Sequence, residues 1–262
     1  MTGPQRIAAA FAGSRKRAAL MPYLMGGFPD LATSRAVGEA YADAGADLVE
    51  LGVPFSDPLA DGPAIHAAAT AALRAGATAE GVLEVAAALA PRLPVVVMCY
   101  ANLVLARGTE AFARGLAGAG VSGLIVPDLP LEEAPATLAA CDASGVALVP
   151  LIAPTTPEER LRAIGGRARG FVYAVGVTGT TGERAEVGQG LAEILARARA
   201  HARVPVAVGF GISTPDQAAA AAAAGADGVI VGSRLVRAAA EAADPPAAVR
   251  GHVAALAGAL AR

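Results

Sequence analysis

The stretch "DAGADLVELGVPFSDP", residues 43–58, contains the unit on which the fold of this 262-residue chain depends. It opens with a glycine-bearing turn of the kind that ends helices, because glycine readily takes the left-handed conformation needed there. A short, continuously apolar run follows, which is typical of a strand covered on both faces. The unit therefore reads as the end of a helix, a buried strand and a loop rich in proline and aspartate.

The same unit recurs along the chain. Turns such as "GAGVSG", "ASGVA" and "AAGAD" precede further apolar runs, and Ala/Leu/Glu/Arg-rich stretches of helical length separate them. The apolar runs cover residues 20–25, 47–53, 94–100, 123–128, 147–153, 170–176, 204–210 and 227–233. Alternating strands and helices indicate a parallel sheet, and eight units favour an α/β fold of one (β/α)8 TIM barrel domain over residues 1–262. A doubly wound open sheet is the alternative. The residues before Leu20 are expected to form an extra N-terminal helix that closes the bottom of the barrel.

Composition excludes several classes of protein. A net charge of −2 argues against a nucleic-acid role, since a phosphate-backbone binder needs a basic face. The sequence has no unbroken apolar run of about 18 or more residues of membrane type. Cys99 and Cys141 lie in apolar surroundings without metal-type spacing, which favours buried free thiols in a reducing cytoplasm. We therefore expect a cytoplasmic protein that acts on a small molecule.

Glu50 places a carboxylate inside the second apolar run. Side chains alternate along a strand, so if Val49 and Leu51 face the helices, Glu50 faces the barrel interior. A buried carboxylate is costly unless it is paired or protonated, and burial raises its pKa. One interpretation is a structural glutamate satisfied by the backbone or a hydroxyl, and the other is a general acid/base.

Asp61 lies in the loop after the same strand, at the end of the barrel where chemistry takes place in this fold. A helix cap is the alternative interpretation, because "DGP" precedes a helical stretch. Two carboxylates in unlike settings take unlike roles, one shuttling protons and the other staying ionised. Asp57, in "SDP", is interpreted from the residues alone as a turn residue.

Glycine-bearing turns follow the last strands of the predicted barrel. "GFGIST" and "GSR" come after the seventh and eighth strands, and "VTGTTGE" comes after the sixth. In many barrels these last loops bind phosphate through backbone N–H groups. Gly211, Gly232 and Ser233 are the candidates, and they predict a small phosphorylated substrate.

Other catalytic groups are missing from the predicted mouth. The only lysine, Lys16, lies far from any strand end, which argues against a Schiff-base mechanism. The three histidines, His66, His201 and His252, do not cluster with acidic residues, so no metal site is expected. No nucleotide-binding fingerprint follows a first strand. Plain acid/base catalysis remains.

The stretch "LVELGVPFSDPLADGP" resembles the signature of the tryptophan synthase alpha subunit family. The motifs "MPYLMGGFPD", "YANL", "PDLPLEE", "GVTGTTGE", "GFGIS" and "GADGVIVGS" occur in that family's order, so the resemblance covers most of the chain. It implies retro-aldol cleavage of indole-3-glycerol phosphate to indole and glyceraldehyde 3-phosphate, the carbon–carbon lyase half-reaction of tryptophan synthase.

The resemblance also implies roles for individual residues. Glu50 would protonate indole C3 and take the proton of the glycerol hydroxyl, Asp61 would hold the indole N–H, and Tyr173 would lie near the glycerol portion. The substrate pocket would be lined by Tyr23, Ile65, Met98, Tyr100, Ile125, Ile152, Thr181 and Phe210. The phosphate cradle would be formed by Gly182, Gly211, Gly232 and Ser233. Departures from residues common in the family are Met25, Gly26, Phe28 and Val177.

A partner subunit follows from the same resemblance. The family works as a heterotetramer of two alpha and two beta subunits, in which indole passes to beta and condenses with L-serine to L-tryptophan. No cofactor is expected in this chain, since pyridoxal phosphate belongs to the beta partner. The contact with beta would be made by Pro54, Phe55, Asp57 and Pro58. Alternatives are a stand-alone lyase that releases free indole, a sugar-phosphate isomerase, and a non-catalytic subunit that only activates beta.

Overall fold

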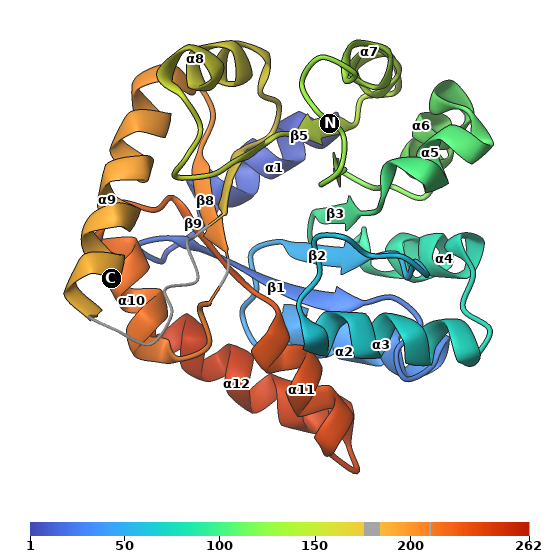
Figure 1. The fold of residues 1–262 in the computed structure, drawn as a ribbon. Coiled ribbons are helices and arrows are strands. Elements are labelled where there is room, and N and C mark those ends of the chain that lie inside the picture. The colour runs from blue at the N-terminus through green and yellow to red at the C-terminus, as the bar shows by residue number, and fades with distance from the viewer. Residues whose placement is uncertain (176–183, 210, 262) are drawn as a thin grey trace.

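The strands form one parallel sheet surrounded by helices (Figure 1). The computed structural model describes residues 1–175, 184–209 and 211–261, with the backbone alone described for 184–189. The strands are β1 (Ala19–Met25), β2 (Val49–Gly52), β3 (Val95–Met98), β4 (Gly123–Ile125), β5 (Ala147–Val149), β6 (Leu151–Ile152), β7 (Val172–Val175), β8 (Val206–Gly209) and β9 (Gly228–Val231). Each of the eight apolar runs therefore contains a strand, as predicted.

The fifth predicted strand is divided in two at Pro150. The strand order is β5-β4-β3-β2-β1-β9-β8-β7-β6, so the two ends of the sheet, β5 and β6, are consecutive in the chain. Proline has no N–H to donate, which explains the break, but the Pro150 carbonyl accepts a hydrogen bond from the Tyr173 N–H at 3.0 Å. The sheet thus closes into a barrel through a single interrupted strand, and the open-sheet alternative is wrong.

Helices surround the sheet, and most of them lie between consecutive strands of the chain. They are α1 (Gly3–Gly13), α2 (Leu31–Asp43), α3 (Pro63–Arg74), α4 (Ala79–Leu89), α5 (Ala101–Arg107), α6 (Thr109–Gly118), α7 (Pro135–Ser144), α8 (Glu158–Arg167), α9 (Arg184–His201), α10 (Pro215–Ala223), α11 (Ser233–Glu241) and α12 (Pro245–Ala259). Gly45, Gly120, Gly145 and Gly225, in the four predicted turns, have φ values of 97°, 72°, 70° and 101°. In the described part of the chain, no helix is long and apolar enough to cross a membrane.

Side chains of the strands alternate between two apolar cores. Val49 and Leu51 of β2 belong to the core between the sheet and the helices. Leu48 belongs to a second core inside the barrel, together with Met21 and Val96 from the flanking strands. The predicted alternation is therefore confirmed, and it directs the side chain of Glu50 into the barrel.

The N-terminal helix α1 closes the bottom of the barrel, as the sequence predicts. Ile7 is fully buried in the interior core, and the rings of Phe11 and Phe171 lie 5.9 Å apart. The Arg6 guanidinium fastens the helix by donating to the carbonyl oxygens of Gly120, at 2.9 Å, and Ala90. Because α1 fills the bottom of the barrel, a substrate can reach the interior only from the opposite end, where the strands have their C-termini.

Shortening the side chain of Ile7, which fills the bottom of the barrel, should lower the stability of the fold by an amount that grows with the number of atoms removed. We expect Ile7→Val to lower the free energy of unfolding by about 0.5–1.5 kcal/mol and Ile7→Ala by about 2–5 kcal/mol, because each leaves a larger cavity in a closed core. Urea unfolding of both variants beside the parent measures this. Equal stability of Ile7→Ala and the parent would show that α1 does not fill the barrel.

Candidate active site

Glu50 lies inside the barrel near the C-terminal end of β2, with 1 % of its surface exposed. The sheet register places it beside Tyr23 of β1 and Val96 of β3. Within the described residues, its Oε2 atom has no hydrogen-bond partner, which disfavours a glutamate fully satisfied by its surroundings. Burial, and secondly the negative charge of Asp61, raise the pKa of Glu50 to about 8. At neutral pH the group therefore holds a proton that it can give away.

Asp61 lies half-buried in the segment between β2 and α3. The N-cap of α3 is Gly62, and no side chain caps this helix, so the alternative interpretation of Asp61 as a helix cap is wrong. Burial raises the pKa of Asp61, while the Tyr100 hydroxyl and His66 lower it. The ionised state expected for Asp61 therefore depends on the polar groups that face it.

Aromatic and aliphatic side chains surround the two carboxylates. Tyr23 and Ile65 share an apolar cluster at the upper end of β1, α3 and α11, and half-buried Met98 packs against this cluster and the barrel interior. Ile125 is fully buried in the interior core. The hydroxyl of Tyr100 accepts a hydrogen bond from the Ala60 N–H at 3.0 Å, next to Asp61. These positions support the predicted pocket wall.

One predicted wall residue points the other way. Ile152 pairs with Ala174 of β7 and belongs to the core between sheet and helices. Leu151, which pairs with Tyr173, packs against the barrel interior. The interruption at Pro150 fixes this register, so Leu151 replaces Ile152 as the inward residue of β6.

Tyr173 enters the site from β7. It is 8 % exposed, and its hydroxyl lies over Gly209 of the neighbouring strand, where an added Cβ would stand only 2.2 Å from the hydroxyl oxygen. After burial, the negative charge of Glu50 is the cause that raises the pKa of Tyr173. The structure therefore places Tyr173 in the barrel interior near Glu50, and its expected place beside the glycerol portion of a substrate stays a prediction.

The predicted phosphate residues lie at the ends of the last strands. Gly232 is the N-cap of α11, and Ser233 is its first residue. A Cβ at Gly232 would lie 3.7 Å from the Tyr23 side chain, so the start of this helix borders the pocket. Gly211 has a φ of 76° and open space around its Cα. The first N–H groups of a helix lack partners within it and attract anions.

Three predicted site residues lie outside the described part of the chain. They are Thr181, Gly182 and Phe210, and Val177 lies in the same undescribed segment.

The loop after β2 connects the pocket to the surface. Pro54 is buried, and the Phe55 ring stacks on Tyr100 with centroids 5.3 Å apart. Asp57 is exposed and accepts a hydrogen bond from the Ser56 hydroxyl at 2.5 Å. Leu59, which was not among the predicted site residues, is 87 % exposed. A large hydrophobic residue in an acidic, proline-rich loop was the available signal for a binding surface.

Other titratable groups lie away from the mouth. Lys16 forms an ion pair with Asp47, before β2, at 2.9 Å. His201 contacts Glu158, and His252 lies 3.3 Å from a nitrogen of Arg234. Among the described residues, no three His, Cys, Asp or Glu side chains gather where they could hold a metal ion.

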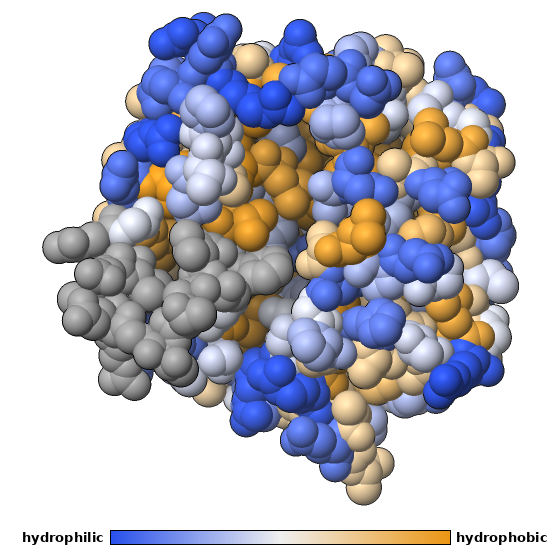
Figure 2. Space-filling model, in the orientation of Figure 1, coloured by the Kyte–Doolittle hydropathy of each residue, from blue (hydrophilic) through white to orange (hydrophobic). Residues whose placement is uncertain are grey.

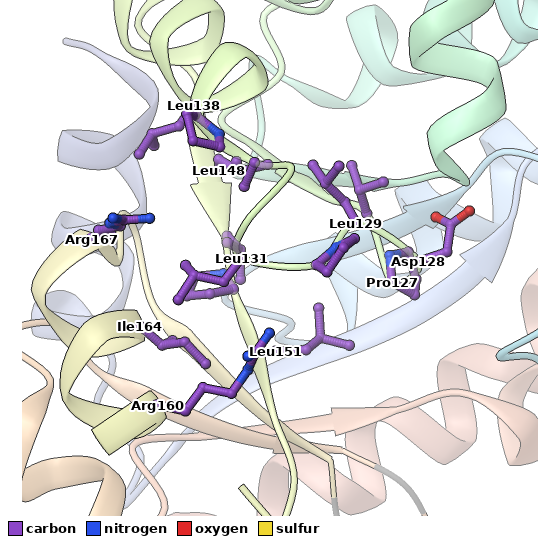
Figure 3. A pocket seen from close by; sticks show the side chains of 16 residues that line it. Pro127, Asp128, Leu129, Leu131, Leu138, Leu148, Leu151, Arg160, Ile164 and Arg167 are labelled. Carbon is purple, nitrogen blue, oxygen red and sulfur yellow. The ribbon is translucent and has the colours of Figure 1, made fainter. Parts of the chain in front are cut away.

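A separate hollow of about 480 Å³ opens between α7 and α8, beside the C-terminal ends of β4 and β5. Figure 3 shows Leu138 and Ile164 on its two helices, with Arg160 and Arg167 along one side. Figure 2 shows hydrophobic side chains between these helices. None of the predicted site residues lines this hollow, so we place the chemistry at Glu50 rather than here.

The fold and the site define a class of protein: a (β/α)8-barrel enzyme with two carboxylates, Glu50 and Asp61, at the C-terminal end of β2. The family model for the tryptophan synthase alpha chain matches residues 10–262. The tryptophan synthase alpha chain of Gloeobacter violaceus is 51 % identical over 247 residues, which cover 93 % of this chain and 90 % of that protein. That of Rippkaea orientalis is 47 % identical over 229 residues, covering 87 % and 86 %.

Solved structures give the same result. A chain of Mycobacterium tuberculosis tryptophan synthase superposes with a TM-score of 0.90 at 41 % identity, covering 98 % of both chains. A chain of the tryptophan synthase a2b2 complex of Pyrococcus furiosus does so with a TM-score of 0.87 at 35 % identity, covering 93 % of this chain and 99 % of its own. The chain belongs to the tryptophan synthase alpha chain family.

The buried Glu50 should make the stability of the fold depend on pH. Its pKa is raised from an ordinary value of 4.5 to about 8, so its ionisation destabilises the folded chain progressively as the pH rises from 4.5 toward 8. Glu50→Gln removes this penalty. We expect the variant to gain roughly 5 kcal/mol at most over the parent at pH 9, and little at pH 4.

Urea unfolding at the two pH values measures the difference. The exposed Glu84→Gln serves as a matched control and should follow the parent at both. If Glu50→Gln changes the free energy of unfolding by the same amount at pH 4 and pH 9, the pKa of Glu50 is not raised by folding.

Proposed function

We propose that residues 1–262 form one catalytic domain that cleaves indole-3-glycerol phosphate to indole and glyceraldehyde 3-phosphate. Membership of the tryptophan synthase alpha chain family supports this reaction. The observation that carries the assignment of roles is Glu50, a carboxylic acid inside the barrel with a pKa of about 8. Such an acid is poised to give and take a proton near neutral pH.

The two carboxylates divide the chemistry. Protonated Glu50 gives its proton to indole C3, which becomes tetrahedral and leaves positive charge on the ring nitrogen. Asp61 holds the N–H and stabilises that charge. The glycerol hydroxyl then returns a proton to Glu50 as its oxygen forms the aldehyde C=O. The electron pair of the broken carbon–carbon bond moves into the ring and neutralises the nitrogen.

Other groups orient the substrate. Tyr173 lies beside Glu50 and is suited to the glycerol portion, while Gly232 and Ser233 at the start of α11 are suited to the phosphate. Met98 and Tyr100 would line the part of the pocket that holds the indole ring. Holding both ends of the substrate aligns the breaking bond with Glu50, which lowers the entropic cost of the reaction.

The reaction calls for no cofactor in this chain, because the protonated indole ring itself accepts the electrons. We place the protein in the cytoplasm, which is supported by two buried cysteines that remain free thiols. Pyridoxal phosphate would be held by a beta partner.

We propose that this partner is a tryptophan synthase beta subunit, which takes up the indole in a heterotetramer of two alpha and two beta subunits. The chain from Pyrococcus furiosus belongs to an a2b2 complex. Pro54, Phe55, Asp57 and Pro58 would make the contact, and the exposed Leu59 beside them supports a partner there. Because Phe55 stacks on Tyr100 beside Asp61, the same loop can report the partner's state to the site.

A stand-alone lyase is the remaining alternative, since it would use the same carboxylates. The exposed, apolar Leu59 favours the coupled form. A purely regulatory subunit is disfavoured by the pairing of Glu50 and Asp61, and an isomerase by the absence of a lysine or histidine beside Glu50 in the described residues.

Removing the acid should abolish the reaction. We expect Glu50→Gln to lower the rate of indole release from indole-3-glycerol phosphate by about 10²–10⁴-fold, because a positioned general acid/base contributes that much. Indole is measured with the beta subunit present. Glu84→Gln, which makes the same substitution at an exposed position, serves as the control. Full activity of Glu50→Gln would mean that another group moves the proton.

Changing the loop should uncouple the partner. We expect Asp57→Ala to keep the slow activity of the isolated chain and to lose about tenfold or more of the activation by beta. Removing one partner of a charge pair that becomes buried between subunits costs about 2–5 kcal/mol, and 1.4 kcal/mol corresponds to tenfold. Indole release is compared with and without beta. Unchanged activation would remove Asp57 from the interface, and strong activity without any activation would favour the stand-alone lyase.

A further inference from the structure

The hollow between α7 and α8 takes no part in the proposed reaction, yet it has the size of a ligand site. Its volume of about 480 Å³ falls within the range of pockets that hold small organic molecules. It is enclosed by the segment after β4, by the two helices, and by β5 and β6 on either side of Pro150. A docked helix is about 10–12 Å across and needs an open groove, so this enclosure favours a small molecule.

Leucine side chains leave part of their surface uncovered in this hollow (Figure 3). Three of them pack with one side against the core between sheet and helices. The leucines that line the hollow are all only half-buried, and they are Leu129, Leu131, Leu138, Leu148 and Leu151. An apolar wall of this kind favours a ligand whose apolar body displaces water from it.

Helix α8 presents two guanidinium groups along one side of the hollow. Arg160, Ile164 and Arg167 are spaced by four and three residues, so they share one face of the helix, and all three line the hollow. The two arginines are separated by about 10 Å along the helix axis. Figure 3 shows Ile164 between them and Arg160 reaching toward Leu151. A ligand here therefore meets two cations in addition to the leucines.

The nearby acids leave one of these cations without a close partner. Glu132 accepts hydrogen bonds from both terminal nitrogens of Arg160, at 2.8 and 2.9 Å. These bonds are the main cause that lowers the pKa of Glu132, and the charge of Arg167 is the smallest. Within the described residues, the Arg167 guanidinium has no hydrogen bond or ion pair. Asp128, the one acid in the lining, accepts from the Ala101 N–H at 2.8 Å, and Figure 3 shows its carboxyl across the hollow from α8.

The two arginines are suited to different parts of a ligand. Arg160 is engaged at its edge by Glu132, and a guanidinium held in this way can still stack its flat face on an aromatic ring. Arg167 keeps its N–H donors for an anion, and the guanidinium fork matches the geometry of a carboxylate.

We propose that this hollow binds an aromatic carboxylate, with its ring between the leucines and the face of Arg160 and its carboxylate on Arg167. A neutral aromatic molecule would leave Arg167 without a partner, and an aliphatic carboxylate would leave the face of Arg160 without a ring. The site is separate from the pocket around Glu50 and does not depend on the proposed reaction.

Binding is tested with 2-naphthoate, and the δ1 methyl group of Ile164 is the reporter because this side chain lines the hollow between the two arginines. Methyl NMR is recorded on the full chain, and Ile164→Val assigns the signal. We expect a saturable shift with a Kd of about 1 mM or below, the affinity that a ligand with so few atoms reaches. The absence of a saturable shift overturns the inference.

The anion's partner is tested with Arg167→Gln, which leaves the leucine walls intact. We expect binding about tenfold or more weaker, because a hydrogen bond between two charged groups is lost. Arg162→Gln, at an exposed position of the same helix outside the hollow, should bind like the parent. In the parent chain, the neutral 2-naphthamide should also bind about tenfold or more weaker. Equal binding of 2-naphthoate by Arg167→Gln and the parent contradicts the proposal.

A third comparison tests whether the ligand must be aromatic. Octanoate carries the same charge but no ring, so we expect it to bind the parent chain about threefold or more weaker than 2-naphthoate. Equal or tighter binding of octanoate would overturn the aromatic class.

Competition separates this hollow from other sites. An unreactive indole-3-propyl phosphate analogue, directed at the pocket around Glu50, should not displace 2-naphthoate, and displacement would place the probe in that pocket instead. In equilibrium dialysis, the chain should retain 2-naphthoate when a tryptophan synthase beta subunit is added. Its release would make the hollow a protein contact and overturn the inference. A chain that binds 2-naphthoate here but releases no indole contradicts the proposed function alone.

Discussion

The burial of one carboxylate controls the rest of the site. Glu50 sits where β2 would otherwise present an apolar side chain to the barrel interior, between Tyr23 and Val96 of the flanking strands. Its desolvation is unfavourable to the charged form, so the Glu50 side chain keeps its proton at neutral pH. The half-buried Asp61 places a negative charge nearby, which reinforces the protonated state of Glu50. The barrel supplies this environment because its bottom is filled and its strands are covered on both faces.

The space around Glu50 is shaped by glycines on neighbouring strands. Tyr23 lies over Gly52, and Tyr173 lies over Gly209. Each hydroxyl therefore occupies space that a side chain at the glycine position would fill. Two phenols, one from β1 and one from β7, thereby lie near one carboxylate without displacing the strands. In physical terms, the glycines keep the sheet regular while the tyrosines bring polar atoms into an apolar interior, where electrostatic interactions are strong.

Sequence reasoning reaches the fold because burial is periodic along the chain, and the inward position of Glu50 follows from the same alternation. It fails where the outcome depends on contacts between strands. The break at Pro150 turns Ile152 outward, and only the pairing with β7 reveals this. The room that Gly52 gives to Tyr23 likewise depends on the register of β1 with β2. Such cross-strand geometry leaves no local pattern in a single sequence.

The central claim is that Glu50 is a buried acid that still carries its proton at neutral pH. Carbon-13 NMR titration of its side-chain carboxyl, in the parent chain and in Asp61→Asn, tests this most directly. The account predicts a midpoint near pH 8 in the parent and a lower one in Asp61→Asn, since the variant lacks the charge that opposes ionisation. A midpoint near the ordinary value of 4.5 in both chains would contradict it.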